Sequence, residues 1–168
     1  MNTFTEITPA DISGNPFRLI GKDWMLITAG NKDKANTMTA SWGGLGVLWN
    51  KPVAFAFVRP TRYTYEFLER EDTFTLSFFP NESTRQALTL CGRVSGRDTD
   101  KIADAGLTLR TDAEAPFFDE ASLVLVCRKV AVQDIDPNGF LDDSIHGHYA
   151  DDYHRVYIGE IIRALRAK

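Results

Sequence analysis

Two arginines and a threonine in the stretch "FVRPTRYTYEF" could together bind a phosphate group. Arg59 ends an apolar run, Pro60 stops that run from continuing as a strand, and Arg62 stands where a helix is predicted to begin. Guanidinium groups, the Thr64 hydroxyl and the free N–H groups of a helix N-terminus all favour an anion. The stretch therefore predicts a site for one phosphate monoester. The alternative is that both arginines only solvate a surface corner and that Thr64 only caps its helix.

A second polar stretch, "CGRVSGRDTDK", lies between two predicted helices and could add donors to a ligand. Gly92 and Gly96 bracket its loop. The side chains that could donate are Ser95, Arg97 and Lys101. The spacing is neither that of a P-loop nor that of a GxGxxG turn after a strand. The alternative is a plain connector in which Gly92 ends the first helix and Asp98 caps the next.

The histidines and Cys91 offer weaker candidates for chemistry. His146 and His148 share one parity of an extended segment with four aspartates nearby, but no third ligand stands at a spacing typical of metal sites. We therefore expect a solvated loop there and no metal. His154, at the head of the last predicted strand, is typical of a hydrogen-bonded structural histidine. Cys91 lies at a predicted helix end with no resolving partner, so we expect an inert thiol.

No Ser-His-Asp order, paired-carboxylate motif or nucleotide-binding fingerprint is present in the sequence. An enzyme whose own side chains perform the bond chemistry is therefore poorly supported. If the protein is an enzyme, a cofactor must supply the chemistry.

The elements that must position these residues include "NTMTASWGGLGVLW", in which two kinds of side chain alternate. An extended chain separates the two parities onto opposite faces. One parity holds Thr37, Thr39 and Ser41, and the other holds Met38, Ala40 and Trp42. The hydrocarbon face is ordinary core. Packing alone explains neither the row of small hydroxyls nor the glycines that follow it, Gly43, Gly44 and Gly46.

The remaining patterns predict a barrel of antiparallel strands with short peripheral helices. Strands are predicted at 24–30, 52–58, 73–79, 122–132 and 154–165, and helices at 64–72, 81–92 and about 98–106. We expect Thr61 or Thr64 to cap the first helix, and Asn81 or Ser83 to begin the second. The 52–58 strand is apolar on both parities, which predicts burial of both faces. Because the strands form hairpin-connected pairs, a barrel fits better than a doubly wound sheet.

Length and composition indicate a single domain over residues 1–168, because a chain of this size can bury a core without disulfides. The net charge of -4, with both signs interspersed, leaves no basic stripe for nucleic acid. Neither a signal peptide nor a membrane span can be read. Cys91 and Cys127 lie far apart with no CxxC, which fits two free thiols. We therefore expect a cytoplasmic protein that binds neither nucleic acid nor membrane.

Four stretches taken together resemble the flavin reductase-like family of FMN-binding split barrels, especially its flavoredoxin-type members. They are the run from "NTMTASWGG" to "EFLERED", "TLSFF", "CGRVSGRDTDK" and "DYHRVYIGEI", in the order that the family has them. The resemblance covers about residues 24–161. It implies a mainly β Greek-key split barrel with peripheral helices, a homodimer, and FMN held noncovalently near the subunit interface.

The resemblance also implies the cofactor-binding residues. Those expected to meet the isoalloxazine ring and the ribityl chain are Thr39, Ala40, Ser41 and Trp42. The glycines that follow would let backbone approach the ring, because a larger side chain would occupy its space. Those expected at the phosphate are Arg59, Arg62 and Thr64, with Tyr63 beside them. The connector would contribute Cys91, Gly92, Ser95, Gly96, Arg97 and Lys101. His154 would line the open face, where a reductant or acceptor docks, as the candidate catalytic residue.

One departure from the family pattern leaves the reductant open. Many flavin reductases of the family carry "GDH" ahead of the last strand, whereas "DDYH" precedes "RVYIGE" here. The leading hypothesis is an FMN-dependent oxidoreductase that passes hydride or electrons through bound FMN, with NAD(P)H as one candidate reductant. The first alternative is an FMN electron carrier between proteins that does not oxidise NAD(P)H. The second is a flavin-binding module without turnover.

Overall fold

A large antiparallel sheet is the central element of the protein in the computed structural model, which describes residues 1–79 and 84–168. Its strands lie in the order β3-β2-β6-β9-β10-β5-β4, and β1 pairs with β10. Their bounds are β1 Phe4–Ile7, β2 Met25–Gly30, β3 Ala35–Ala40, β4 Gly43–Leu48, β5 Lys51–Val58, β6 Thr73–Phe78, β9 Leu123–Asp134 and β10 Arg155–Ala167. A separate small sheet pairs β7 (Leu109–Arg110) with β8 (Phe117–Phe118). Each described pair is antiparallel, which confirms the predicted arrangement.

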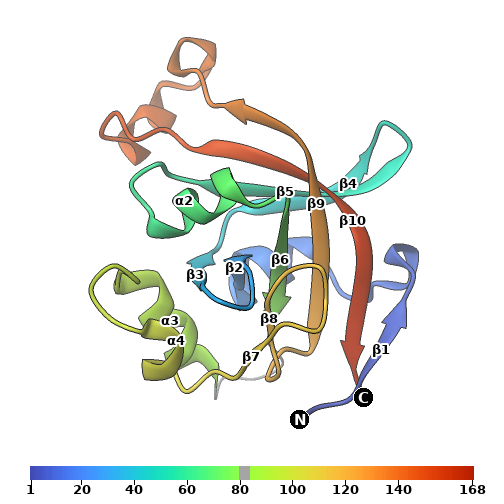
Figure 1. The fold of residues 1–168 in the computed structure, drawn as a ribbon. Coiled ribbons are helices and arrows are strands. Elements are labelled where there is room, and N and C mark those ends of the chain that lie inside the picture. The colour runs from blue at the N-terminus through green and yellow to red at the C-terminus, as the bar shows by residue number, and fades with distance from the viewer. Residues whose placement is uncertain (80–83) are drawn as a thin grey trace.

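Short helices lie around this sheet (Figure 1). Their bounds are α1 Pro16–Arg18, α2 Tyr63–Arg70, α3 Arg85–Arg93 and α4 Lys101–Asp104, with a π-helical turn η2 at Leu19–Asp23 and 3-10 turns η1 Pro9–Asp11, η4 Pro137–Gly139 and η5 Asp143–His148. The turns η4 and η5 belong to a long excursion between β9 and β10, residues 135–154, at the upper left of Figure 1. None of the helices in the described part of the chain is long and apolar enough to cross a membrane.

The positions of β3 and β4, the first and last strands of the sheet, explain why the fold is a split barrel. β3 and β4 follow each other in the chain, yet they stand at opposite ends of the hydrogen-bonded order. Only Ser41 and Trp42 join them. The sheet therefore curls round so that its two end strands meet at this joint, and the mainly β split-barrel fold is confirmed.

The barrel interior is filled by one parity of its strands. Phe74, Leu76 and Phe78 of β6 are buried together, which confirms the predicted alternation. β10 passes this cluster at a β-bulge between Ile158 and Gly159. A Cβ atom on Gly159 would lie 2.7 Å from Phe74 Cζ. The strand can therefore cross the core here only because residue 159 has no side chain.

The start of the helix after β5 differs from the prediction. α2 begins at Tyr63, its N-cap is Arg62, and no side chain makes a capping hydrogen bond, so the expected caps Thr61 and Thr64 are wrong. The reason is that the Arg62 N–H closes a turn by donating to the Arg59 carbonyl at 3.0 Å.

The helices of the connector also end elsewhere. α3 continues past Gly92 to Arg93, and its expected start at Asn81 or Ser83 lies outside the described residues. α4 is shorter than 98–106, and Asp100 caps it, where Asp98 had been expected. The Asp100 carboxylate accepts a hydrogen bond from the Ala103 N–H, which fixes the first turn.

Two strand predictions need correction. Trp24 lies outside β2, because its φ of 69° is incompatible with an extended strand. β5 is not buried on both faces: Ala54 and Ala56 are inside, whereas Phe55 and Phe57 are half-exposed. The aromatic face of β5 is therefore available to line a site.

Candidate functional site

A cavity of about 150 Å³ lies where β3, β5 and α2 converge. Its lining residues are Met38, Thr39, Ala40, Ser41, Trp42, Phe57, Arg59, Arg62 and His154. Ser41 and Arg62 were predicted from different stretches as a ring contact and a phosphate contact. The structure brings both into one cavity, together with His154.

The hydroxyl face of β3 is less open than the sequence predicts. The buried Thr37 and Thr28 hydroxyls bond each other at 2.9 Å. The Thr39 hydroxyl donates to the Leu88 carbonyl of α3 at 2.5 Å, because α3 packs on this face. Of the three predicted hydroxyls, Ser41 alone has no hydrogen bond to a described residue.

Different local surroundings explain the glycines that follow the joint between β3 and β4. A Cβ atom on Gly43 would lie 2.9 Å from Met25 Cε and 3.0 Å from the Phe55 carbonyl oxygen, so close packing within the chain requires glycine there. A Cβ on Gly46 would meet open space. Access for a ligand is therefore not the only reason for this glycine-rich stretch.

The two arginines among the predicted phosphate ligands both line the cavity. Arg62 is exposed, and its guanidinium donates to the Gly92 carbonyl at 3.1 Å. Arg59 donates from Nη1 to Asp152 Oδ2 at 2.6 Å and from Nη2 to the His148 carbonyl at 2.8 Å. The hydrogen bond from Arg59 lowers the pKa of the Asp152 carboxyl. One guanidinium is therefore engaged by a carboxylate, and the other is bound only by a neutral carbonyl.

Thr64 and Tyr63 do not line this cavity. Thr64 is fully buried, and its hydroxyl accepts a hydrogen bond from Asn36 Nδ2 at 2.7 Å. Tyr63 packs against Phe67 and lines a different cavity, of about 580 Å³, beside the connector. Binding of the phosphate by these two residues stays a prediction.

The connector residues Lys101 and Arg97 bind the helices around them, Lys101 the end of α3 and Arg97 the helix α2. Lys101 is only 4% exposed, and its ammonium donates to the Cys91 and Val94 carbonyls at the end of α3. Burial lowers the pKa of Lys101. Arg97 pairs with Glu66 at 2.5 Å and lies over the Tyr63 ring.

Backbone packing explains the small residues of the same connector. A Cβ atom on Gly96 would lie 2.0 Å from Asn36 Oδ1, so the loop can pass β3 only with glycine there. The Ser95 hydroxyl accepts a hydrogen bond from the Arg97 N–H. Burial raises the pKa of the Cys91 thiol to about 11, which agrees with the inert thiol expected. Cofactor binding by Cys91, Gly92, Ser95, Gly96, Arg97 and Lys101 stays a prediction.

His154 lies at the inner wall of the cavity and is 7% exposed. Its Nδ1 shares a hydrogen bond of 2.9 Å with the Tyr149 hydroxyl, and the Trp42 ring lies 5.3 Å away. Burial, followed by the nearby Arg59 cation, lowers the pKa of His154 to about 4. The imidazole is therefore neutral at pH 7, and it lines the cavity as an uncharged hydrogen-bonding group.

The β9–β10 excursion supplies site residues that the sequence analysis missed. Tyr149 covers His154, and Asp152 holds Arg59. The "DDYH" motif was the available signal, but nothing in its spacing places it beside a residue 93 positions away. His148 and His146 lie in the 3-10 turn η5, which corrects the extended segment expected for them. Across the described residues, no group of three or more His, Cys, Asp or Glu side chains could hold a metal ion.

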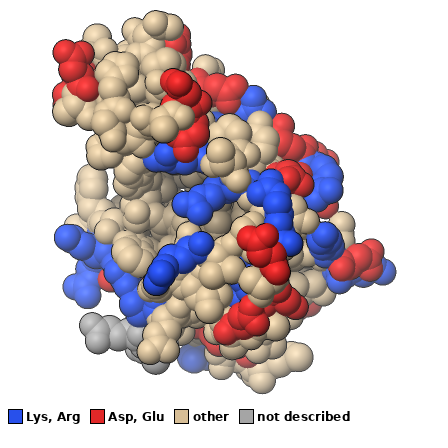
Figure 2. Space-filling view, turned by 90° about the vertical axis from the view of Figure 1, so that its left-hand side faces the viewer, with Lys and Arg blue, Asp and Glu red and all other residues tan. Residues whose placement is uncertain are grey.

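A larger groove adjoins the cavity. It has a volume of about 540 Å³ and shares Ser41, Trp42 and Phe57 with the cavity. Its other residues come mainly from the N-terminal segment, β4 and the excursion, and they include Phe17, Ile20 and Tyr149. Figure 2 shows that this side of the molecule is hollowed and that Lys and Arg side chains border the hollow. The site thus combines an apolar wall with a cationic rim.

Comparison with known proteins identifies the family of the chain. Residues 17–167 match the flavin reductase like domain. A comparison with curated proteins found no match. Among solved structures, the chain is similar to an FMN-binding domain of a flavin reductases-like enzyme from Shewanella baltica, with TM-score 0.70, 22% identity, and 98% of this chain and 78% of that chain covered.

Two flavoredoxins have the same fold. The one from Methanosarcina acetivorans has TM-score 0.64 and 27% identity over 84% of this chain and 67% of that chain. The one from Desulfovibrio vulgaris has TM-score 0.65 and 23% identity over 86% of this chain and 69% of that chain. Because the family match covers nearly the whole chain and the same split barrel recurs in these structures, the protein belongs to the flavin reductase-like domain family.

Proposed function

We propose that this protein is an FMN-dependent oxidoreductase of the flavin reductase and flavoredoxin type. One observation carries the proposal: Ser41, at the joint of the barrel, and two arginines, at the start of α2, line the same cavity. A singly phosphorylated ligand with a polar-edged ring needs these two kinds of group within one site. The family, whose solved members include an FMN-binding domain, supports the same cofactor.

The residues present fit this cofactor. When bound, FMN would supply the chemistry by accepting and passing on hydride or electrons. Ser41 has a hydroxyl available to bond the polar edge of a ring, and Trp42 and Phe57 provide an apolar wall beside it. Arg62 provides a cation for the phosphate. Neutral His154 can donate or accept one hydrogen bond without adding charge near the ring.

The test of the proposal is the visible spectrum of the purified protein. We expect flavin absorbance, or its appearance when FMN is added to the colourless protein and the excess is removed. A preparation that is colourless and takes up no FMN would refute the proposal.

The electron donor separates the oxidoreductase from the carrier alternative. "DDYH" in place of "GDH" is the observation that keeps the carrier open. Stopped-flow mixing of the FMN-loaded protein with NADH, NADPH and a reduced ferredoxin distinguishes them. Reduction by either nicotinamide supports the oxidoreductase, whereas reduction by ferredoxin alone supports the carrier.

We propose further that the protein is a cytoplasmic homodimer. Phe17 is 86% exposed and Trp42 is 44% exposed, and both line the groove beside the cavity. Such an apolar surface at a ligand site is typical of a face that a second copy covers. Two buried free thiols support a reducing compartment. Sedimentation velocity of the pure protein measures the oligomeric state directly.

Replacing Arg62 with alanine is expected to weaken FMN binding by about 1.5–3 kcal/mol, because one charge-assisted hydrogen bond to the phosphate is lost. Riboflavin, which has no phosphate, should bind wild type and Arg62→Ala nearly alike. Fluorescence titration with both flavins measures this. Arg70→Ala, at the other end of α2, is the matched control and should leave both affinities unchanged. An equal loss for both flavins would mean that Arg62 is structural.

A further inference from the structure

Arg59 is one of the two arginines predicted to bind the phosphate, yet the chain itself already binds it. Asp152 Oδ2 accepts from Nη1 at 2.6 Å, and the His148 carbonyl accepts from Nη2 at 2.8 Å. The Tyr149 ring lies 5.1 Å from the guanidinium carbon. These three partners come from one short segment, residues 148–152, which contacts the cavity-lining residues Arg59, Trp42 and His154. We call this segment the strap.

The strap places a negative charge where a phosphate would need a positive one. Arg59 lowers the pKa of Asp152, so this carboxyl stays ionised at neutral pH. A phosphate dianion beside Arg59 would therefore lie close to a like charge, which disfavours binding. With Asp152 in place, the corner offers the full charge of Arg62 and a largely compensated charge of Arg59.

One residue of the strap is also held in a backbone conformation that residues other than glycine rarely adopt. Asp151, next to Asp152, has φ of 61°, in the left-handed region. The Asp152 carboxylate braces this turn, because its Oδ1 accepts from the Ala150 N–H at 3.1 Å while its Oδ2 binds Arg59. Release of Arg59 would remove one of the contacts that hold the turn.

The size of the cavity agrees with a strap that has to move. Ligand cavities commonly measure roughly 300–1,000 Å³. The cavity under the strap measures about 150 Å³. Tyr149 of the strap also lines the adjoining groove, so its displacement would enlarge that groove beside the cavity.

We propose that Asp152 is an internal competitor for the flavin phosphate: it occupies Arg59 in the ligand-free protein, the phosphate displaces it, and FMN is thereby held weakly enough to exchange. The inference rests on the proposed function, since it takes FMN as the ligand. Asp152 acts through Arg59 and is a residue that sets affinity, without contact to the reacting ring.

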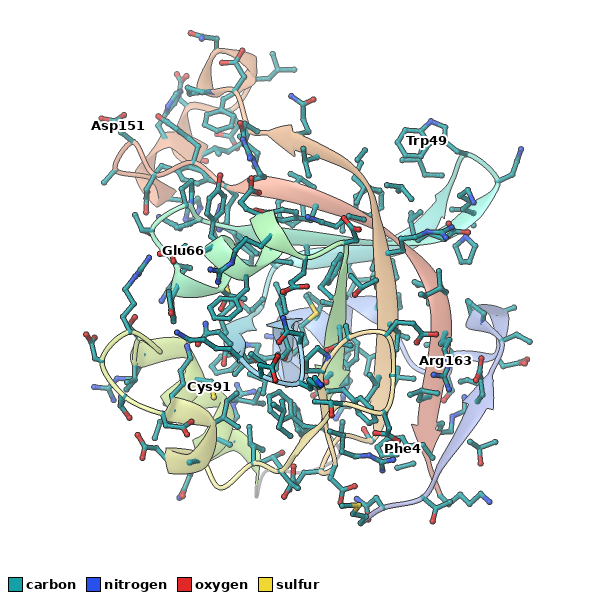
Figure 3. The ribbon with its side chains drawn as sticks, viewed as in Figure 1. Phe4, Trp49, Glu66, Cys91, Asp151 and Arg163 are labelled. Carbon is teal, nitrogen blue, oxygen red and sulfur yellow. The ribbon has the colours of Figure 1, made fainter. Side chains whose placement is uncertain are left out.

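The decisive variants are Asp152→Asn and its matched control Asp151→Asn. Both remove one carboxylate from the strap, but Asp151 lies at the outer side of the excursion (Figure 3). Among the described residues, the carboxylate that binds Arg59 is that of Asp152 and not that of Asp151. Asparagine also tolerates the left-handed conformation at 151. Fluorescence titration and stopped-flow dissociation are measured with FMN and with riboflavin.

Asp152→Asn is expected to tighten FMN binding on the order of tenfold, mainly through slower dissociation, because the phosphate gains an unopposed guanidinium. Riboflavin affinity should change less than about twofold, because riboflavin has no phosphate to gain that contact. Asp151→Asn should change neither. Unchanged or weaker FMN binding in Asp152→Asn would overturn the proposal, because Asp152 would then orient Arg59 for the phosphate.

Inorganic phosphate provides a readout that does not depend on flavin. We expect phosphate to raise the thermal midpoint of Asp152→Asn more than those of wild type and Asp151→Asn. Equal shifts in all three proteins would overturn the proposal. If none of them binds FMN but phosphate selectively stabilises Asp152→Asn, the proposed function fails while the competition at Arg59 stands.

Discussion

Gly159→Ala is expected to lower the free energy of unfolding by about 3 kcal/mol, because it overpacks a rigid part of the core. The new methyl carbon would lie 2.7 Å from Phe74 Cζ and 2.8 Å from Cys127 Cβ. Neither neighbour can yield easily: both residues are fully buried, and a Cβ atom moves only with its backbone. Urea unfolding of the wild type and the variant, followed by circular dichroism, measures the loss.

Gly46→Ala is the matched control, because it makes the same substitution in β4 where a Cβ meets open space. It should change stability by only a few tenths of a kcal/mol. A double-mutant cycle identifies the cause: Phe74→Leu should cost less in the Gly159→Ala background than in the wild type. Additive losses would show that the clash with Phe74 is not the source of the effect.

The second large effect is a loss of stability in acid that arises from His154. Its pKa is about 4 in the folded protein, against 6.5 for an unperturbed histidine. Above pH 6.5 the imidazole is neutral in both states, and its full contribution to stability is present. As the pH falls from 6.5 to 4, the unfolded chain takes up a proton that the folded protein does not, so stability falls by roughly 3 kcal/mol. Below pH 4 both states are protonated, and this loss stops.

His154→Gln isolates that contribution, because glutamine can keep a hydrogen bond to Tyr149 but does not titrate. Urea unfolding at a series of pH values between 7 and 4 gives a stability curve for each protein. The difference between the two curves removes the contribution of the carboxyl groups that both share. We expect the wild type to lose its advantage as the pH falls. A constant difference over this range would show that His154 titrates normally in the folded protein.

The strands could be predicted from the sequence because each carries its own periodic pattern. In β6, the alternation of Phe74, Leu76 and Phe78 with small polar residues is set by the two faces of the sheet. The ends of the helices could not be predicted as well, because distant partners set them. Lys101 binds the end of α3 from the far side of the connector, and no local signal marks that contact.

The site was predictable where neighbours in sequence are also neighbours in space. Arg59 and Arg62 lie on one turn, and the resemblance placed Ser41 with them. The opposing carboxylate was not predictable, because the ion pair between Arg59 and Asp152 depends on how a long excursion folds back over the barrel. The packing of α3 against the hydroxyl face was not predictable either: the Thr39 hydroxyl donates to the Leu88 carbonyl, and ligand binding by this face stays a prediction.

The joint between β3 and β4 has a mechanical consequence. The two end strands of the barrel, β3 and β4, are not paired with each other in the described structure, so the barrel wall has an open seam between them. The cavity lies along this seam, between the end of β3 and the end of β5. Side-chain movement at the joint can therefore widen the cavity without breaking a hydrogen bond between β3 and β4. The part of the barrel wall that can adapt without loss of strand pairing thus coincides with the proposed ligand site.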